Sequence, residues 1–155
     1  QTLQGTGTVN GTLNLGGGTL RPGTSVGDLT TGPAFSGTGS TYVAELGPGL
    51  SSDTWIVAGL LDLSASGDIL DIQLLGGAEG YSPDPIISAA GGISGWFDSV
   101  YYGGNLIADP FSRGSLGGAY RIKLVGGNAY VIPEPASVAV LALAGLAALR
   151  RRVRK

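Results

Sequence analysis

The chain has 155 residues with 29 glycines, no cysteine, no histidine and a formal net charge of −2. This length allows one domain with its own core. The lack of cysteine and histidine excludes disulfides, thiol chemistry and the usual catalytic base at neutral pH. Glycine occurs at more than twice its average frequency of about 7%, while the hydrophobic content of 43% argues against disorder. We therefore expect repetitive β structure rather than an α/β enzyme.

The charge is distributed unevenly along the chain. The first 149 residues contain four basic and 11 acidic side chains, a net charge of −7, whereas residues 150–155 contain five basic ones. An acidic body disfavours nucleic acid as a partner. The chain contains no methionine, so we expect Gln1 to be a processed or cut end.

Short alternating apolar and polar stretches, separated by glycine and proline, predict strands in the first half of the chain. We expect them at Thr12–Leu15, Gly18–Leu20, Thr41–Leu46, Trp55–Val57, Leu60–Leu63 and Ile69–Leu75. Pro22 and Gly23 suit the two central positions of a type II turn. Strands that recur about every 10 to 15 residues predict an all-β fold. We favour a β-solenoid over a closed barrel, because stacked rungs bury each other's apolar faces.

Beyond residue 78 the pattern is less regular. We expect strands at Ile86–Ala89, Gly95–Phe97, Ala119–Val125 and Ala129–Val131, and a loop-rich excursion from Tyr101 to Ser115. The solenoid body is thus predicted to occupy residues 1–130.

The composition changes abruptly at residues 131–155. Pro133-Glu134-Pro135 interrupts the β pattern, because proline lacks the amide that a ladder needs. Ala136–Leu149 is uncharged and rich in alanine and leucine, which predicts a helix with no solvent face. Its apolar side chains include Ala136, Val140, Leu141, Leu143, Leu146 and Leu149.

A basic end follows the helix, formed by Arg150, Arg151, Arg152, Arg154 and Lys155. The positive-inside rule places such a block on the cytoplasmic side of a membrane. The helix covers only about 21 Å of a hydrocarbon core nearer 30 Å, and snorkelling arginines add effective length. We expect a single C-terminal transmembrane helix; the alternative is a buried helix of the globular body.

This tripartite tail resembles the PEP-CTERM sorting signal of Gram-negative bacteria, with Pro133, Glu134 and Pro135 as its sorting and processing motif. The resemblance covers about the last 25 residues. It implies export, anchoring in the inner membrane with the body in the periplasm, and processing near the motif by an exosortase-type membrane protease. It further implies a later location at the cell surface or outside the cell, often together with exopolysaccharide and biofilm.

The body also resembles a known family. Residues 18–30, Gly-Thr-Leu-Arg-Pro-Gly-Thr-Ser-Val-Gly-Asp-Leu-Thr, are similar to autotransporter-associated β-strand repeats, and residues 86–98 resemble the strand pair that follows in such passengers. The resemblance implies the C-terminal rungs of a right-handed parallel β-helix.

Few residues suggest chemistry in the body. Asp62, Asp68 and Asp71 could form an acid/base pair or a calcium site, but we interpret Asp62 and Asp71 as solvent-facing strand residues and Asp68 as a turn residue. The glycine-rich stretches lack the lysine and the helix that phosphate binding needs. We therefore predict no catalytic residue, metal site or cofactor. Among the aromatic residues, Trp55, Trp96 and Phe97 suit core packing, and Tyr101 and Tyr102 are the candidates for stacking on sugars.

Together these features predict a non-enzymatic, exported cell-envelope or extracellular-matrix protein of structural or adhesive type. Its expected partners are an exosortase-type protease, the inner membrane and an exopolysaccharide, with no nucleic acid. Two alternatives remain open. One is a surface polysaccharide-active enzyme whose active part lies upstream; the other is a carbohydrate- or ice-binding module. The threonines in the first 20 residues are too irregularly spaced for an ice-binding array.

Overall fold

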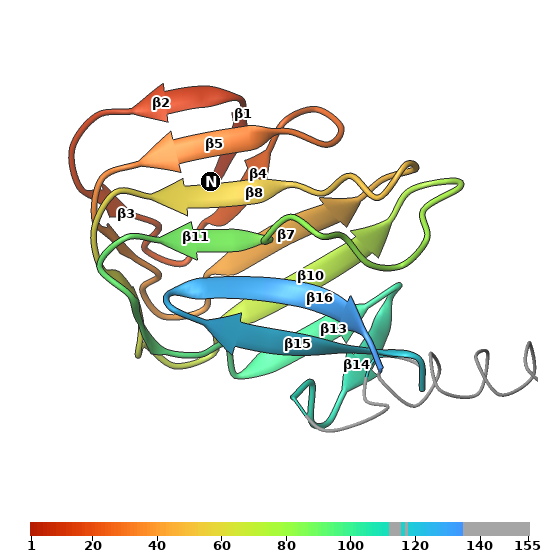
Figure 1. Ribbon diagram of the computed structural model, residues 1–155. Helices are drawn as coiled ribbons and strands as arrows, with labels where there is room; N and C mark the ends of the chain where they lie inside the picture. The colour runs from red at the N-terminus through yellow and green to blue at the C-terminus, as the bar shows by residue number, and fades with distance from the viewer. Residues whose placement is uncertain (112–115, 117, 135–155) are drawn as a thin grey trace, which may run out of the picture.

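A computed structural model describes residues 1–111, 116 and 118–134, which form 16 β-strands and no helix (Figure 1). The strands belong to three sheets. Sheet A contains, in spatial order, β1 (Thr2–Gly5), β4 (Thr19–Pro22), β7 (Thr41–Leu46), β10 (Ile69–Leu74), β13 (Ser99–Tyr102) and β14 (Asn105–Ile107). Sheet B contains β15 (Tyr120–Val125), β16 (Asn128–Pro133), β11 (Ile87–Ala89), β8 (Thr54–Val57), β5 (Asp28–Thr31) and β2 (Gly7–Val9). Sheet C contains β12 (Ile93–Gly95), β9 (Leu61–Leu63), β6 (Ala34–Phe35) and β3 (Leu13–Asn14).

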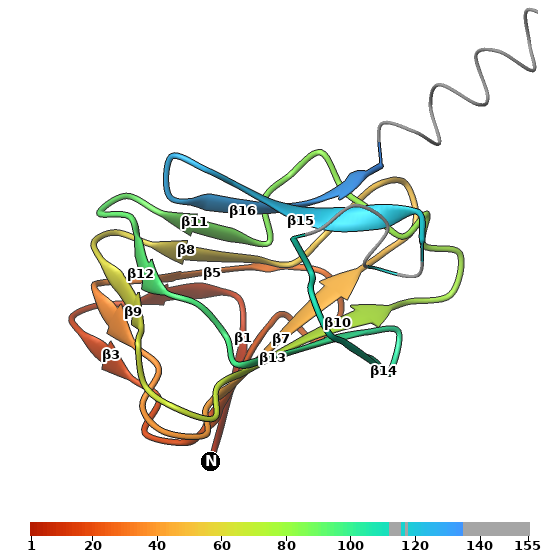
Figure 2. The ribbon, with the colours of Figure 1, turned by 90° about the horizontal axis from the view of Figure 1, so that it is seen from below.

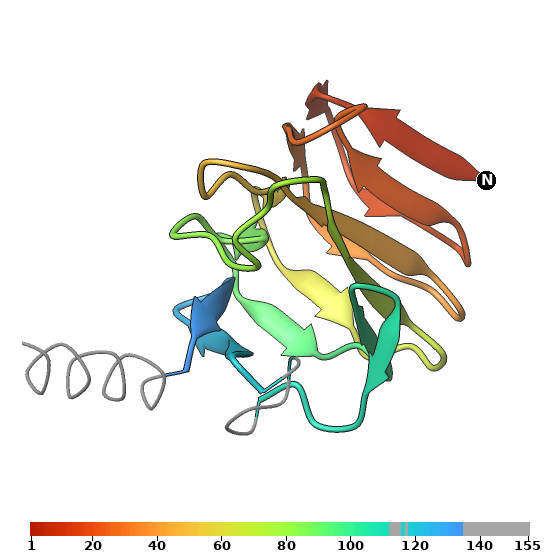
Figure 3. The same ribbon diagram turned by 90° about the vertical axis from the view of Figure 1, so that its right-hand side faces the viewer.

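The chain visits the three sheets in a fixed order and then repeats the circuit. Each of the first four circuits, here called rungs, adds one strand to sheet A, then one to sheet B and one to sheet C. Neighbouring strands from successive rungs are parallel. Figure 2 shows the three sheets around a common interior, and Figure 3 shows the rungs stacked from the N-terminal end. This arrangement is compatible with a β-solenoid.

The core is built from columns of side chains at equivalent positions of successive rungs. Alternation within each strand sends every second side chain inward, and parallel pairing in register stacks those side chains on one another. The sheet A column contains Leu20, Tyr42, Leu70 and Val100, and the sheet B column contains Leu29, Trp55, Ile87 and Ala129; all eight are buried. The two columns meet inside, where the rings of Tyr42 and Trp55 lie 5.4 Å apart.

Glycines occupy the corner between sheets B and C, where the rungs approach too closely for a side chain. A Cβ atom at Gly32 would lie 2.2 Å from the carbonyl oxygen of Gly11, and one at Gly91 would lie 2.5 Å from the amide nitrogen of Leu60. A Cβ atom at Gly59, in the rung between them, would lie 2.8 Å from the ring of Pro33. Part of the high glycine content is therefore required by the close stacking of rungs at this corner.

The two ends of the stack are built differently. At the N-terminal end β1, β2 and β3 each form the edge of a sheet, and residues 1–18 contain no charged side chain. At the other end the pairing becomes antiparallel. Strand β14 folds back on β13, β16 pairs antiparallel with β11, and β15 and β16 form a hairpin across Gly126 and Gly127.

Most predicted strands are confirmed within one or two residues, and two predictions are wrong. Tyr101 and Tyr102 do not begin a loop, because they lie in β13, in register with Asp71 and Ile72 of β10. The predicted strand at 95–97 lies two residues too late, since β12 spans Ile93–Gly95. Gly95 has a φ of 75°, a left-handed conformation at which the chain leaves the strand.

Candidate functional site

The predicted sorting signal begins at the end of β16, and the structure describes the first two residues of its motif, Pro133 and Glu134. The rest lies outside the described residues, namely Pro135, the predicted membrane helix with Ala136, Val140, Leu141, Leu143, Leu146 and Leu149, and the basic end with Arg150, Arg151, Arg152, Arg154 and Lys155. In the part of the chain that is described, no helix has the length and apolarity needed to cross a membrane.

Pro133 is the last residue of β16, so the strand continues into the motif instead of stopping before it. It pairs with Tyr120, and the next amide, that of Glu134, donates a hydrogen bond to the carbonyl oxygen of Ala119 at 2.8 Å. Pro133 therefore occupies a non-hydrogen-bonded position of the β15–β16 ladder, where its missing N–H breaks no bond to β15. The body boundary predicted at residue 130 falls inside β16.

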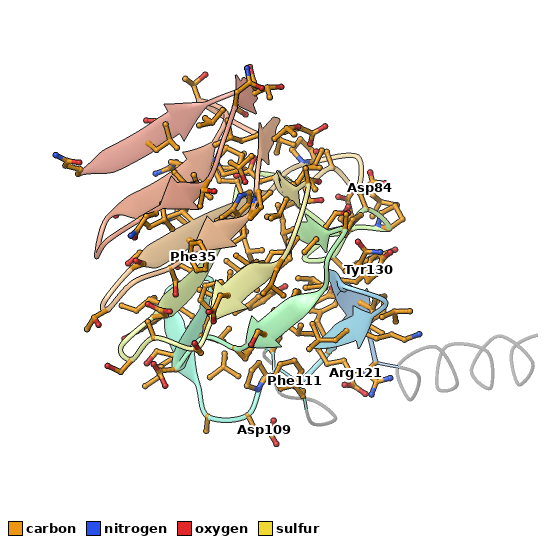
Figure 4. All side chains as sticks on the ribbon, turned by 90° about the vertical axis from the view of Figure 1, so that its left-hand side faces the viewer. Phe35, Asp84, Asp109, Phe111, Arg121 and Tyr130 are labelled. Carbon is orange, nitrogen blue, oxygen red and sulfur yellow. The ribbon has the colours of Figure 1, made fainter. Side chains whose placement is uncertain are left out.

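The side chain of Glu134 is buried beside Arg121. The residue is only 2% exposed, and its Oε1 lies 3.8 Å from Nε of Arg121 on the neighbouring strand. Figure 4 shows Arg121 on the β15–β16 hairpin, at the end of the molecule where Phe111 also lies. Burial of a carboxylate is costly unless a cation or hydrogen-bond donors compensate it, and Arg121 supplies the positive charge here.

The hairpin itself is fixed to the last rungs by tyrosines. The hydroxyl of Tyr120 donates to the carbonyl oxygen of Glu79 at 2.8 Å, and its ring lies 6.0 Å from that of Tyr102 and 5.9 Å from that of Tyr81. The hydroxyl of Tyr102 donates to the carbonyl oxygen of Gly80 at 2.7 Å. Burial, with a contribution from Tyr120, raises the pKa of Tyr102 to about 12. These contacts pack the start of β15 against the core.

The three candidate aspartates are not brought together into one site. Asp62 lies in sheet C, where hydrogen bonds from Ser64 lower the pKa of its carboxyl. Asp71 lies in sheet A and accepts a hydrogen bond from Nε2 of Gln73 at 2.7 Å. Both side chains are partly exposed, as predicted for solvent-facing strand positions.

Asp68 lies in the turn between sheets C and A, as predicted, although it is fully buried. Its Oδ1 accepts a hydrogen bond from the amide of Ser40 in the preceding rung at 3.1 Å. The preceding residue, Gly67, has a φ of 79° and so makes the turn possible. Among the described residues no group of three or more acidic side chains is arranged to hold a metal ion.

Sequence reasoning missed a buried charged cluster at the corner between sheets A and B. Glu45 is 2% exposed and pairs with Arg21 of the preceding rung. Asp53 is fully buried, and its carboxylate accepts the amides of Gly27 at 2.8 Å and of Glu45 at 2.9 Å. Burial is the main cause that raises the pKa of Asp53 to about 7, and the neighbouring Glu45 carboxylate adds to the shift. The sequence carried a signal for this cluster, since Glu45 is the only charged residue of β7.

The outer face of sheet A carries a groove of about 450 Å³, lined by Asp71, Gln73, Leu74, Gly103 and Gly104. Tyr101 lies opposite Asp71 on the next strand and shares its outward face. Tyr102, the other predicted sugar-stacking residue, points into the interior and is 9% exposed. Trp55 and Phe97 are buried, which confirms the predicted core packing of both residues.

Comparison of the chain with protein-family models, with curated proteins and with solved structures gave no match.

Proposed function

We propose that this chain is an exported cell-envelope or extracellular-matrix protein with a structural or adhesive β-solenoid body, sorted by a PEP-CTERM-type signal. The observation that carries the proposal is the sequence of the tail, in which three parts follow one another: Pro133-Glu134-Pro135, the uncharged stretch Ala136–Leu149, and the arginine-rich end. In this arrangement the apolar stretch anchors the chain in the inner membrane, and the cationic end sets its orientation. An exosortase-type protease then recognises the motif.

The body supports a structural role through its shape. A stack of rungs offers long, regular surfaces, and its stability is built from contacts between neighbouring rungs. Within the described residues the buried charged side chains have internal contacts: Glu45 with Arg21, Asp53 with two backbone amides, Asp68 with the amide of Ser40, and Glu134 with Arg121. The acidic surface favours solubility and disfavours nucleic acid.

The N-terminal rung presents regular strand edges to the surface. Its three strands are sheet edges, and they lack the charged side chains that usually protect such edges from pairing. A shallow hollow of about 250 Å³ opens there between residues of β1, β3 and the start of β4.

The sorting proposal is tested by expressing the full chain in hosts with and without an exosortase, followed by fractionation and intact-mass measurement. We expect loss of the 136–155 segment and release from the membrane only when the protease is present. A full-length product in the membrane of both hosts would leave an anchor without processing. A full-length product that is soluble in both hosts would overturn the proposal.

A second candidate function is carbohydrate binding at the sheet A groove, favoured by the combination of Tyr101, Asp71 and Gln73. Sugars are bound by aromatic rings that cover their apolar face and by planar polar groups that bond their hydroxyls. The test is retention of the purified protein on immobilised bacterial exopolysaccharide. Tyr101→Ala should abolish retention, while Tyr130→Ala, on sheet B, should not. Equal retention of both variants would exclude this groove as the binding site.

A further inference from the structure

The predicted motif does not begin as a free tail, because its first residue, Pro133, is the last residue of β16, and its second, Glu134, is hydrogen-bonded to the segment before β15. Pro133 pairs with Tyr120, and the amide of Glu134 is bonded to Ala119 at 2.8 Å. The Glu134 side chain is 2% exposed, with Arg121 3.8 Å from its carboxylate. Another protein would recognise Glu134 through its backbone amide and its side chain, and both already make contacts within the chain.

We infer that the folded body masks its own sorting motif, and that a membrane protease reaches Pro133 and Glu134 only when the end of the β15–β16 hairpin is open. The inference rests on the proposed function. Proteases and other proteins bind peptide segments in extended form, using backbone hydrogen bonds together with pockets for alternate side chains. In the closed hairpin the Glu134 amide is bonded to Ala119 and the carboxylate is buried beside Arg121, so neither is presented.

The masking contact is coupled to the fold of the last rungs. Tyr120, the partner of Pro133, packs on Tyr81 and Tyr102 and is bonded to the Glu79 carbonyl. The inward residues Ile122 and Val131, which face each other across the hairpin, are buried. Separation of β16 from β15 near the motif therefore exposes apolar surface as well as Glu134, and the closed form is favoured once the body is complete. Processing should accordingly precede closure of the hairpin or follow its local opening.

The chain offers a covalent way to lock the hairpin, because it contains no cysteine of its own. Ile122 and Val131 lie two positions from the Tyr120–Pro133 pair on each strand, so they also form a non-hydrogen-bonded pair. Cα atoms in such pairs are about 4.5 Å apart, within the range that a disulfide spans. The double variant Ile122→Cys with Val131→Cys leaves Pro133, Glu134 and Arg121 unchanged. Its reduced form is the matched control for its oxidised form.

A second pair of variants, one that loosens the mask and one matched control, tests the contact with Arg121. Arg121→Ala removes the cation beside the buried Glu134 carboxylate and should favour opening. Lys123→Ala removes a positive charge from the same face of β15, but Lys123 is exposed and pairs with Tyr130. Hydrogen exchange of the Glu134 amide reports opening directly, without any protease.

The experiment incubates each full-length variant, reconstituted in vesicles, with membranes from exosortase-positive and exosortase-negative hosts and follows cleavage by intact mass. We expect the oxidised double-cysteine variant to be cut at least about tenfold more slowly than its reduced form, because cleavage tracks the open population. Arg121→Ala should be cut about fivefold faster than wild type and exchange its Glu134 amide faster, while Lys123→Ala should match wild type.

Equal cleavage of the oxidised and reduced forms would overturn the masking inference while leaving the sorting proposal intact. Equal amide exchange in Arg121→Ala and Lys123→Ala, with equal cleavage, would overturn the role of Arg121 in holding the mask. Absence of exosortase-dependent cleavage in every form, including the urea-unfolded chain, would overturn the proposed function and the inference that rests on it.

Discussion

The buried carboxylate of Asp53 accepts a hydrogen bond from the backbone amide of Glu45 at 2.9 Å, and this contact ties the loop before β8 to the end of β7. Asp53 also accepts the amide of Gly27 from the preceding rung. A single side chain thus joins three segments at the corner between sheets A and B. The protonation state of Asp53 therefore affects the stability of the protein.

Asp53 should make the protein less stable as pH rises. Burial raises its pKa from 3.8 to about 7, so the folded state holds the proton more tightly than the unfolded chain does. This stabilisation is complete below about pH 4 and is lost as pH rises through 7. Relative to Asp53→Asn, which stays neutral, wild type should lose on the order of 2–4 kcal/mol of unfolding free energy between pH 4 and 8. Urea unfolding across this range measures the difference. Asp84→Asn, at an exposed carboxylate, should keep the wild-type slope, and parallel slopes for all three proteins would contradict the prediction.

Arg21 and Glu45 should depend on each other for stability. Glu45 is buried, so Arg21→Met leaves its carboxylate without a cation. We expect the free energy of unfolding to fall by about 2–4 kcal/mol. This is less than the cost of breaking a fully buried ion pair, because Arg21 is partly exposed. The double variant Arg21→Met with Glu45→Met removes both charges and should recover most of that loss. Chemical denaturation of the four proteins gives the coupling free energy. Additive losses in the double variant would show that the two side chains act independently.

Thr31 should stabilise the protein by accepting a hydrogen bond from the Trp55 indole. Nε1 of Trp55 donates to Oγ1 of Thr31 at 3.0 Å, and both residues are buried. Thr31→Val keeps the shape but leaves the indole N–H without its acceptor, which should cost about 1–3 kcal/mol. The control is Thr30→Val, on the outward face of the same strand, which should change stability by less than about 0.5 kcal/mol. Thermal unfolding followed by circular dichroism distinguishes the two, and equal melting temperatures would disprove the dependence.

Gly91 should not tolerate a side chain. A Cβ atom there would lie 2.5 Å from the amide nitrogen of Leu60 and 2.7 Å from the carbonyl carbon of Gly59, both backbone atoms that cannot easily move. Gly91→Ala should therefore destabilise the protein by about 1–3 kcal/mol. Gly76→Ala is the matched control, since a Cβ atom at Gly76 would have no neighbour within 4 Å. Urea midpoints measure both variants. A Gly91→Ala midpoint at or above that of the control would refute the close-approach argument.

Much of the fold could be predicted from local sequence patterns. Alternation within Thr41–Leu46 and Ile69–Leu75 marked strands that the structure confirms, because one strand's inward and outward faces depend only on that strand's residues. Gly67 marked the turn that holds Asp68. The return of β14 after Tyr102 was missed, since the turn at Gly103 and Gly104 reads in sequence like any other glycine pair.

The sequence by itself determined an all-β chain with most of its strands, the turn glycines and the composition of the tail, because these depend on residues close together along the chain. Only the tertiary structure decided which rungs stack in which register. It paired Arg21 with Glu45, 24 residues away, and it brought Thr31 within hydrogen-bond distance of the Trp55 indole. It also drew Glu134, a polar residue in a proline-flanked motif, into a buried contact with Arg121. These contacts depend on the separation of whole rungs, and no local pattern of apolar and polar residues encodes which strand of another rung becomes the neighbour.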